Sequence, residues 1–121
     1  DAMKDGPPSL VIVDTLSRCM AGGDENNQKD CSAAIATLDY WRQRSGCAEL
    51  VIHHTTKNVS GNGKPGYRGS SVIYGAMDNM MAMALSGDEV ILSNDVQKDE
   101  ESFAAIPLKF RVSGASGLLV P

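Results

Sequence analysis

The chain has 121 residues, of which 42% are hydrophobic and 21% charged, and its formal net charge is −4 at pH 7. This composition excludes a disordered, collagen-like or coiled-coil chain, and no apolar stretch reaches the roughly 20 residues that cross a bilayer. We therefore expect one small domain, or part of one, in the cytoplasm rather than in a membrane. Its mild acidity disfavours sequence-independent wrapping of nucleic acid, which requires many phosphate-neutralising cations.

The first predicted strand is a continuous apolar run over residues 9–13, which follows Gly6-Pro7-Pro8 and stops at Asp14. Such a run is typical of a strand buried on both faces, as in parallel sheets. Residues 15–29 are rich in glycine and polar side chains and predict a loop. Asp30 is then expected to cap a helix that ends at Gly46, with basic residues in its last turn.

A second short apolar strand over residues 50–52 runs into His53-His54. The order strand, helix, strand predicts a β-α-β unit, which implies a parallel sheet. Residues 55–69 follow and contain four glycines interleaved with Lys57, Lys64 and Arg68. We expect a long loop there, and loops of this length are usually functional or disordered.

The C-terminal third is predicted to be antiparallel, with one or two helical turns before it over residues 70–75. Residues 77–85 are apolar enough to predict another strand, with a helix as the alternative because Met and Ala are good helix formers. A hairpin turn at residues 86–88 leads into a strand over 89–92, and a polar turn over 95–101 leads into a strand over 103–112.

The three cysteines, Cys19, Cys31 and Cys47, lack the C-x-x-C spacing of zinc or redox sites. We expect all three to be free, buried thiols.

Polar side chains follow both strands of the β-α-β unit. In open parallel sheets ligands bind beyond the carboxyl ends of the strands, so Asp14 and the histidine pair are predicted to share one edge. A carboxylate at the end of a rigid strand suits the hydrated magnesium of a nucleotide hydrolase. Asp14 as a simple turn-capping residue is the alternative.

The histidine pair is less suited to binding a metal. Adjacent strand residues point to opposite faces, so at most one of His53 and His54 faces a given site. A zinc site needs three or four ligands, and the chain has no other histidine. A neutral histidine that donates a hydrogen bond to a phosphate or a water is the favoured interpretation.

The glycine-rich segment over residues 55–69 contains the basic side chains that are candidates for binding phosphate or nucleic acid. Arg68 suits contact with phosphate oxygens as an arginine finger, the alternative being a solvated surface arginine. Lys57 and Lys64, with Tyr67 as a stacking partner, suit single-stranded nucleic acid. A phosphate-binding loop G-x-x-x-x-G-K-[ST] occurs nowhere in the sequence, and the nearest match, residues 61–66, is followed by Tyr67.

Taken together, four short motifs resemble the second half of a RecA-like ATPase, and most closely the RepA-type hexameric replicative helicases of plasmids and phages. The resemblance covers roughly residues 9–110. The motifs are residues 11–18 (Val-Ile-Val-Asp-Thr-Leu-Ser-Arg), residues 22–26 (Gly-Gly-Asp-Glu-Asn), residues 51–55 (Val-Ile-His-His-Thr) and residues 68–71 (Arg-Gly-Ser-Ser).

The resemblance implies a fold and a set of roles. The fold would be α/β, a partial RecA-like core with a mixed sheet, in one domain over residues 1–121. Asp14 would hold the magnesium-bound water, and His53 or His54 would sense the γ-phosphate of ATP. Arg68 and Lys98 would act in trans on a neighbouring subunit's nucleotide, and residues 22–29 and 57–67 would face single-stranded DNA in a prokaryotic hexameric ring.

The sequence also departs from the family. The family's phosphate-loop lysine and catalytic glutamate lie upstream of the Asp14 strand, and Asp14 is followed by Thr15 rather than an acid. The central first strand of the sheet is missing as well, which leaves unpaired edges. We therefore expect no hydrolysis of ATP by this chain alone, no tight binding of ATP or Mg²⁺, and a homo-oligomer or a dimer through an exposed sheet edge.

Two further interpretations stay open. The first is a truncated, non-catalytic RecA-like module that acts in oligomerisation or in protein or DNA binding. The second is a small α/β domain whose resemblance has no functional meaning.

Overall fold

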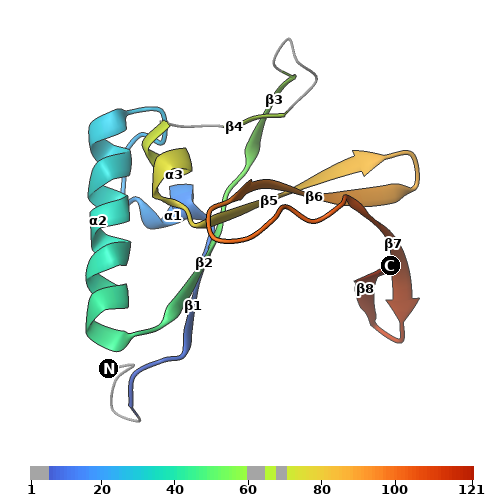
Figure 1. Ribbon diagram of the computed structural model, residues 1–121, viewed down its shortest axis with the longest axis horizontal. Coiled ribbons are helices and arrows are strands. Elements are labelled where there is room, and N and C mark those ends of the chain that lie inside the picture. Colours follow the sequence, from blue (N-terminus) through green and yellow to red (C-terminus); the bar gives the residue numbers. More distant parts are fainter. Residues whose placement is uncertain (1–5, 60–64, 68–70) are drawn as a thin grey trace. The chain divides into compact units, whose positions relative to one another are not determined.

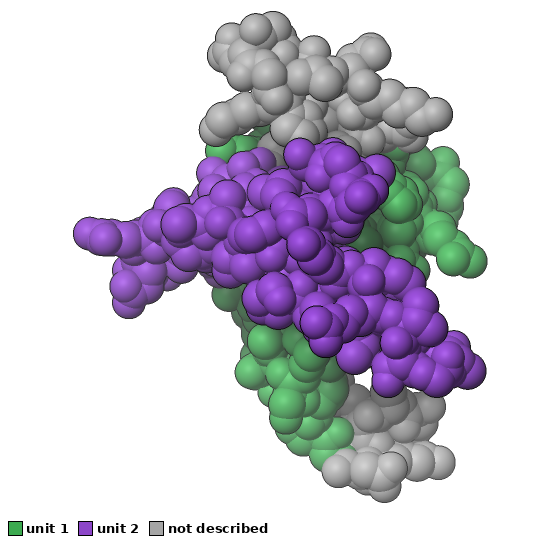
Figure 2. All heavy atoms as spheres, turned by 90° about the vertical axis from the view of Figure 1, so that its right-hand side faces the viewer, with its two compact units in different colours: residues 1–76 green, residues 77–121 purple. Residues whose placement is uncertain are grey.

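The computed structural model describes residues 6–59, 65–67 and 71–121, and the chain forms two compact units (Figures 1 and 2). Unit 1 is residues 1–76 and unit 2 is residues 77–121. The elements of unit 1 are β1 (Leu10–Asp14), α1 (Leu16–Cys19), α2 (Gln28–Ser45), β2 (Ala48–Ile52), β3 (Thr55–Val59), β4 (Pro65–Tyr67) and α3 (Ser71–Ala76). Those of unit 2 are β5 (Asn79–Ser86), β6 (Glu89–Gln97), β7 (Ile106–Ser113) and β8 (Ser116–Val120).

The predicted β-α-β unit is present in unit 1. β1 and β2 lie side by side and pair in parallel (Figure 1). Their register runs from Leu10 opposite Ala48 to Asp14 opposite Ile52. The helix α2 connects the two strands, because a parallel pair cannot be joined by a tight turn. The α/β class, with a parallel unit followed by antiparallel strands, is confirmed. The described strands form three separate sheets, β1-β2, β3-β4 and β5-β6-β7-β8.

The two faces of β1 differ in burial, so the prediction that both are buried is wrong. Val13 is buried on the face that meets α2, whereas Leu10 and Ile12, on the other face, are 50% and 57% exposed. An apolar run shows only that a strand tolerates cover on both faces. The cover itself must come from a second layer on each side, which the strand's own residues do not specify.

The helix α2 is fixed at both ends by side-chain and backbone caps. Asn27, rather than the predicted Asp30, is its N-cap: Asn27 Oδ1 accepts hydrogen bonds from the backbone N–H of Lys29 (2.9 Å) and of Asp30 (3.4 Å). Asp30 lies in the first turn, and its carboxylate accepts a hydrogen bond from the Asp24 N–H at 2.9 Å. The helix ends at Gly46 as predicted, since the φ of 68° there favours glycine.

Two segments predicted as loops contain regular structure. The first contains α1, whose Leu16 is only 2% exposed, and the start of α2. The second contains β3 and β4, which pair antiparallel with Thr55 opposite Tyr67. The prediction gave the glycines more weight than the β-forming Thr, Val and Tyr residues around them, and pairing with each other was enough to make these residues strands. The predicted turns over residues 70–75 are the helix α3, which buries Ile73.

Unit 2 is a four-stranded antiparallel sheet in the order β5-β6-β7-β8. The predicted strand over residues 77–85 is confirmed as β5, and the predicted hairpin turn contains Gly87 with φ of 60°. β6 continues to Gln97, beyond the predicted end, and β7 begins three residues later than expected. The last strand, β8, was not predicted.

The cysteines differ in burial. Cys31 and Cys47 are buried free thiols, as predicted, and the Cys31 Sγ donates to the Glu25 carbonyl oxygen at 3.1 Å. Cys19 is a free thiol too, but it is exposed, so its predicted burial is wrong. Its place on the short helix α1 leaves it at the surface while Leu16 takes the buried position. None of the helices in the described residues is long and apolar enough to span a membrane.

The cap of α2 gives a first prediction. Asn27→Ala leaves the N–H groups of Lys29 and Asp30 without their side-chain acceptor, so we expect the free energy of unfolding to fall by about 1 kcal/mol. Urea denaturation followed by circular dichroism measures the change. Gln43→Ala, at an exposed position within the same helix, is the control and should change it by less than about 0.5 kcal/mol. Equal effects of the two substitutions would contradict the capping role.

Candidate functional site

The carboxyl ends of β1 and β2 form one edge, and the predicted acidic and imidazole side chains lie along it. Asp14, the last residue of β1, is directly opposite Ile52, the last residue of β2, and His53 follows at once. The backbone therefore brings Asp14 and the histidine pair to the same edge, as the parallel arrangement predicts.

These side chains differ in their access to solvent. Asp14 and His54 are exposed, whereas His53 is half-buried. Both histidines lie beyond the last paired residue of β2, so the strand alternation that was expected to separate them ends before it reaches them. An exposed carboxylate with a half-buried imidazole on the neighbouring chain end can receive a small polar ligand from solvent.

The turn that follows Asp14 is anchored in the core of unit 1. Thr15, directly after Asp14, is only 7% exposed. The Thr15 carbonyl oxygen accepts hydrogen bonds from the backbone N–H of Arg18 (3.1 Å) and of Cys19 (3.2 Å), and the adjacent Leu16 is buried. Sequence reasoning treated Thr15 only as the absence of an acid. The structure shows it as the buried residue that fixes the chain just after the carboxylate.

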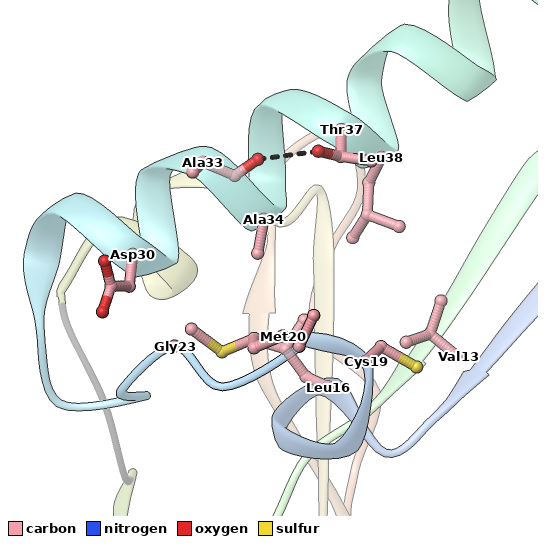
Figure 3. A pocket seen from close by; sticks show the side chains of 11 residues that line it. Val13, Leu16, Cys19, Met20, Gly23, Asp30, Ala33, Ala34, Thr37 and Leu38 are labelled. Atoms are coloured by element: carbon pink, nitrogen blue, oxygen red, sulfur yellow. Dashed lines mark hydrogen bonds between the residues drawn. The ribbon is translucent and has the colours of Figure 1, made fainter.

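A cavity of about 330 Å³ lies in unit 1 between the α1 segment and α2 (Figure 3). Its lining is mostly apolar, and Thr37 turns its hydroxyl to the Ala33 carbonyl oxygen at 2.9 Å. Asp14, His53 and His54 are not among its lining residues. An apolar cavity offers few partners to a charged phosphate, so this hollow is distinct from the polar edge. Its lining residues are Val13, Leu16, Cys19, Met20, Ala21, Gly23, Asp30, Ala33, Ala34, Thr37 and Leu38.

The protein ligands available for a metal are few in the part of the chain that the structure describes. No group of three or more His, Cys, Asp or Glu side chains there is arranged to hold a metal ion. A single exposed carboxylate such as Asp14 suits Mg²⁺ that keeps most of its water and is held mainly by substrate phosphates.

The predicted cations lie elsewhere in the chain. Lys98 is in unit 2, where its Nζ lies 3.5 Å from Asp78 Oδ1 and its backbone N–H donates to the Asp78 carbonyl oxygen at 3.1 Å. Lys57 is in β3 and Tyr67 in β4, on paired strands rather than in the predicted loop. Lys64 and Arg68 lie outside the described residues.

Glu49 is an ionisable group that sequence reasoning passed over. It lies in β2 opposite Val11, and among the described residues its Oε1 is enclosed without a hydrogen-bond partner. Burial raises the pKa of this carboxyl, Arg42 opposes the shift, and Asp39 adds to it. A glutamate next to an apolar run was the available signal, but the predicted strand began one residue too late to include it.

The shifted pKa of Glu49 predicts a pH dependence of stability. Because the folded-state pKa is raised, the folded chain binds this proton more tightly, and stability is lost as pH rises from about 4.3 through the folded pKa. Glu49→Gln should therefore raise Tm at pH 7 relative to the wild type, and the difference should shrink near pH 4. Glu100→Gln, at an exposed position, should show no such trend. Thermal scans at both pH values test this, and a difference that is the same at both would contradict it.

Comparison with known families bears on the same part of the chain. Residues 1–60 match a family model described as an AAA domain. No curated protein matches the chain. The match includes β1, α2 and β2, with Asp14 and the histidine pair at their ends. This part of the chain is thus similar to an ATPase domain of the AAA, P-loop-like type.

Proposed function

We propose that the chain is the C-terminal part of a RecA-like, DNA-dependent ATPase of the replicative helicase type. The observation that supports this most directly is the shared edge of Asp14 and His53, in the region similar to an AAA domain. Four motifs in the expected order, between residues 11 and 71, support the resemblance, which covers roughly residues 9–110.

Each residue of the edge has a separate task in this proposal. Asp14 would help to hold the hydrated magnesium ion through its carboxylate, and its buried neighbours Thr15 and Leu16 keep that carboxylate in place. Bound Mg²⁺ would neutralise charge on the phosphates of ATP. His53 or His54 donates a hydrogen bond toward the γ-phosphate. The half-buried His53 is the better placed of the two, because its imidazole is less free to move.

The remaining predicted residues would act on a neighbouring subunit's nucleotide or on DNA. Arg68 and Lys98 would reach a neighbouring subunit's nucleotide in a homo-oligomer, a hexameric ring in this family. Lys98 would exchange the Asp78 carboxylate for a phosphate, which is feasible because an ion pair whose side chains are 42% and 74% exposed contributes little stability. Lys57, Lys64 and Tyr67 would contact single-stranded DNA through charge and stacking.

A non-catalytic binding module is the second candidate. It is favoured by the β1-β2 sheet, which has only two strands among the described residues, so each strand has one unpaired edge. Unpaired strand edges readily accept a strand from another chain. In this interpretation the chain forms a dimer, or docks on a longer relative, through such an edge.

The proposed role of Asp14 in binding magnesium can be tested by a metal titration that does not depend on ATPase activity. Mn²⁺ titrated into the isotope-labelled chain should broaden the amide NMR signals of residues 14, 15 and 53 through its paramagnetism. Asp14→Asn should abolish the broadening, because it removes the carboxylate charge. Asp88→Asn, an exposed acid in the β5-β6 turn of unit 2, is the matched control and should leave it unchanged. Broadening that survives in Asp14→Asn would contradict the assignment.

The absence of a phosphate-loop motif from the sequence gives a prediction about turnover. The chain alone, with ATP, Mg²⁺ and single-stranded DNA, should release phosphate no faster than its Asp14→Asn variant. A malachite-green phosphate assay measures this. Magnesium-dependent turnover by the chain alone that is lost in Asp14→Asn would contradict this prediction. It would show that the chain binds the phosphates of ATP without a phosphate-loop motif.

A further inference from the structure

One face of the unit 2 sheet is apolar along all four strands. Residues directly opposite in neighbouring antiparallel strands lie on the same face, and so do alternate residues along one strand. The register joins Leu85, Val90 and Leu108 across β5, β6 and β7, and it places Phe110 opposite Leu119 of β8. We call this set the apolar face: Met81, Met83, Leu85, Val90, Leu92, Ile106, Leu108, Phe110, Val112 and Leu119.

The opposite face has a different character. It carries Ser86, Glu89 and Lys109 in register, and the Lys109 Nζ lies 3.4 Å from Glu89 Oε1. It also carries Arg111 opposite Leu118. The apolar face also carries one polar residue, Asn94, opposite Met81. This division between a charged, mixed face and a mostly apolar one is typical of a sheet whose apolar face is buried against another layer.

The apolar face is nevertheless at the surface. Its five most exposed side chains, Met81, Met83, Leu85, Phe110 and Val112, are between 54% and 78% exposed. They leave on the order of 600 Å² of apolar surface, the upper end for the largest patch of a typical monomer and near the roughly 800 Å² that each partner contributes to a stable interface.

At the edge strand β8, a glycine of the apolar face lies under an aromatic ring. A Cβ at Gly117 would collide with the Phe110 ring, so this glycine lets the ring lie across β8. An aromatic ring over a glycine of an edge strand is a known way to stabilise such a strand. An apolar sheet face can pack on another sheet at a spacing of about 10 Å.

We propose that the apolar face is an interface between two copies of this chain, packed face to face as a two-layer sandwich. None of its ten side chains is ionisable, so it has no group to pair with a nucleic acid or with a charged peptide. A second copy presents the same apolar face. A two-fold axis packs the two apolar faces against each other, so both copies use the same residues in the interface. The interface uses the face of unit 2 and is independent of the nucleotide edge and of strand-edge pairing.

Size-exclusion chromatography with light scattering tests the interface. We expect a mass near twice 12.8 kDa over a range of about 1 to 200 µM, with dissociation toward the low end. Leu85→Gln, on the apolar face, should weaken the dimer at least tenfold. Leu118→Gln, the same change on the opposite face at an exposed position, is the matched control and should alter the dissociation constant less than twofold.

A second variant guards against misfolding. Val112→Thr keeps the branched shape and the strand preference while it adds a hydroxyl to the interface, so it should weaken the dimer with an unchanged circular dichroism spectrum. A monomer at all concentrations would overturn the proposal. A dimer that neither Leu85→Gln nor Val112→Thr weakens, or that Leu118→Gln weakens as much, would overturn it too and would assign the contact to another surface.

Discussion

The parallel pairing of β1 with β2 is the constraint on which the candidate site depends. Parallel strands end at the same edge, so the register that sets Asp14 opposite Ile52 also sets it beside His53, although 39 positions of sequence separate the two. An antiparallel pairing of the same strands would put the carboxylate and the imidazoles at opposite ends. The chemistry proposed for the edge therefore follows from the direction of two five-residue strands.

That direction is maintained by the connection between the strands. The helix α2 begins at the Asn27 cap and ends at Gly46, and between them it crosses the buried face that carries Val13. Beyond the carboxyl end of β1, Thr15 and Leu16, which directly follow Asp14, are buried. The carboxylate thus projects from a fixed point into solvent. Glu49 lies on the covered face as well, where its raised pKa reflects the cost of enclosing a carboxyl.

The sequence alone predicted those helices and strands that have a regular pattern of apolar residues and are bounded by glycine, proline or polar residues. The run before Asp14, the helix up to Gly46, the strand before His53 and the hairpin at Gly87 all follow from local composition, and the shared edge follows from the parallel rule. The cover of each strand face, the β3-β4 hairpin and the exposure of Cys19 depend on which segments meet in space. Local composition does not contain that information.

The same limit applies to the site. Asp14 and the histidines were accessible to sequence reasoning because each ends an apolar strand. Thr15 and Glu49 were not, since their importance comes from burial under α1 and α2. The ten residues of the apolar face appear in the sequence only as scattered hydrophobic positions, and the four-strand register unites them.

The arrangement of β1 and β2 is the claim to test first. Nuclear Overhauser effects between backbone protons of residues 10–14 and 48–52 report strand direction and register directly. We predict the interstrand pattern of a parallel pair, with residue 14 close to residue 52 and residue 10 close to residue 48. Contacts that join residue 10 to residue 52, or the absence of interstrand contacts, would contradict the account, because Asp14 and His53 would then share no edge.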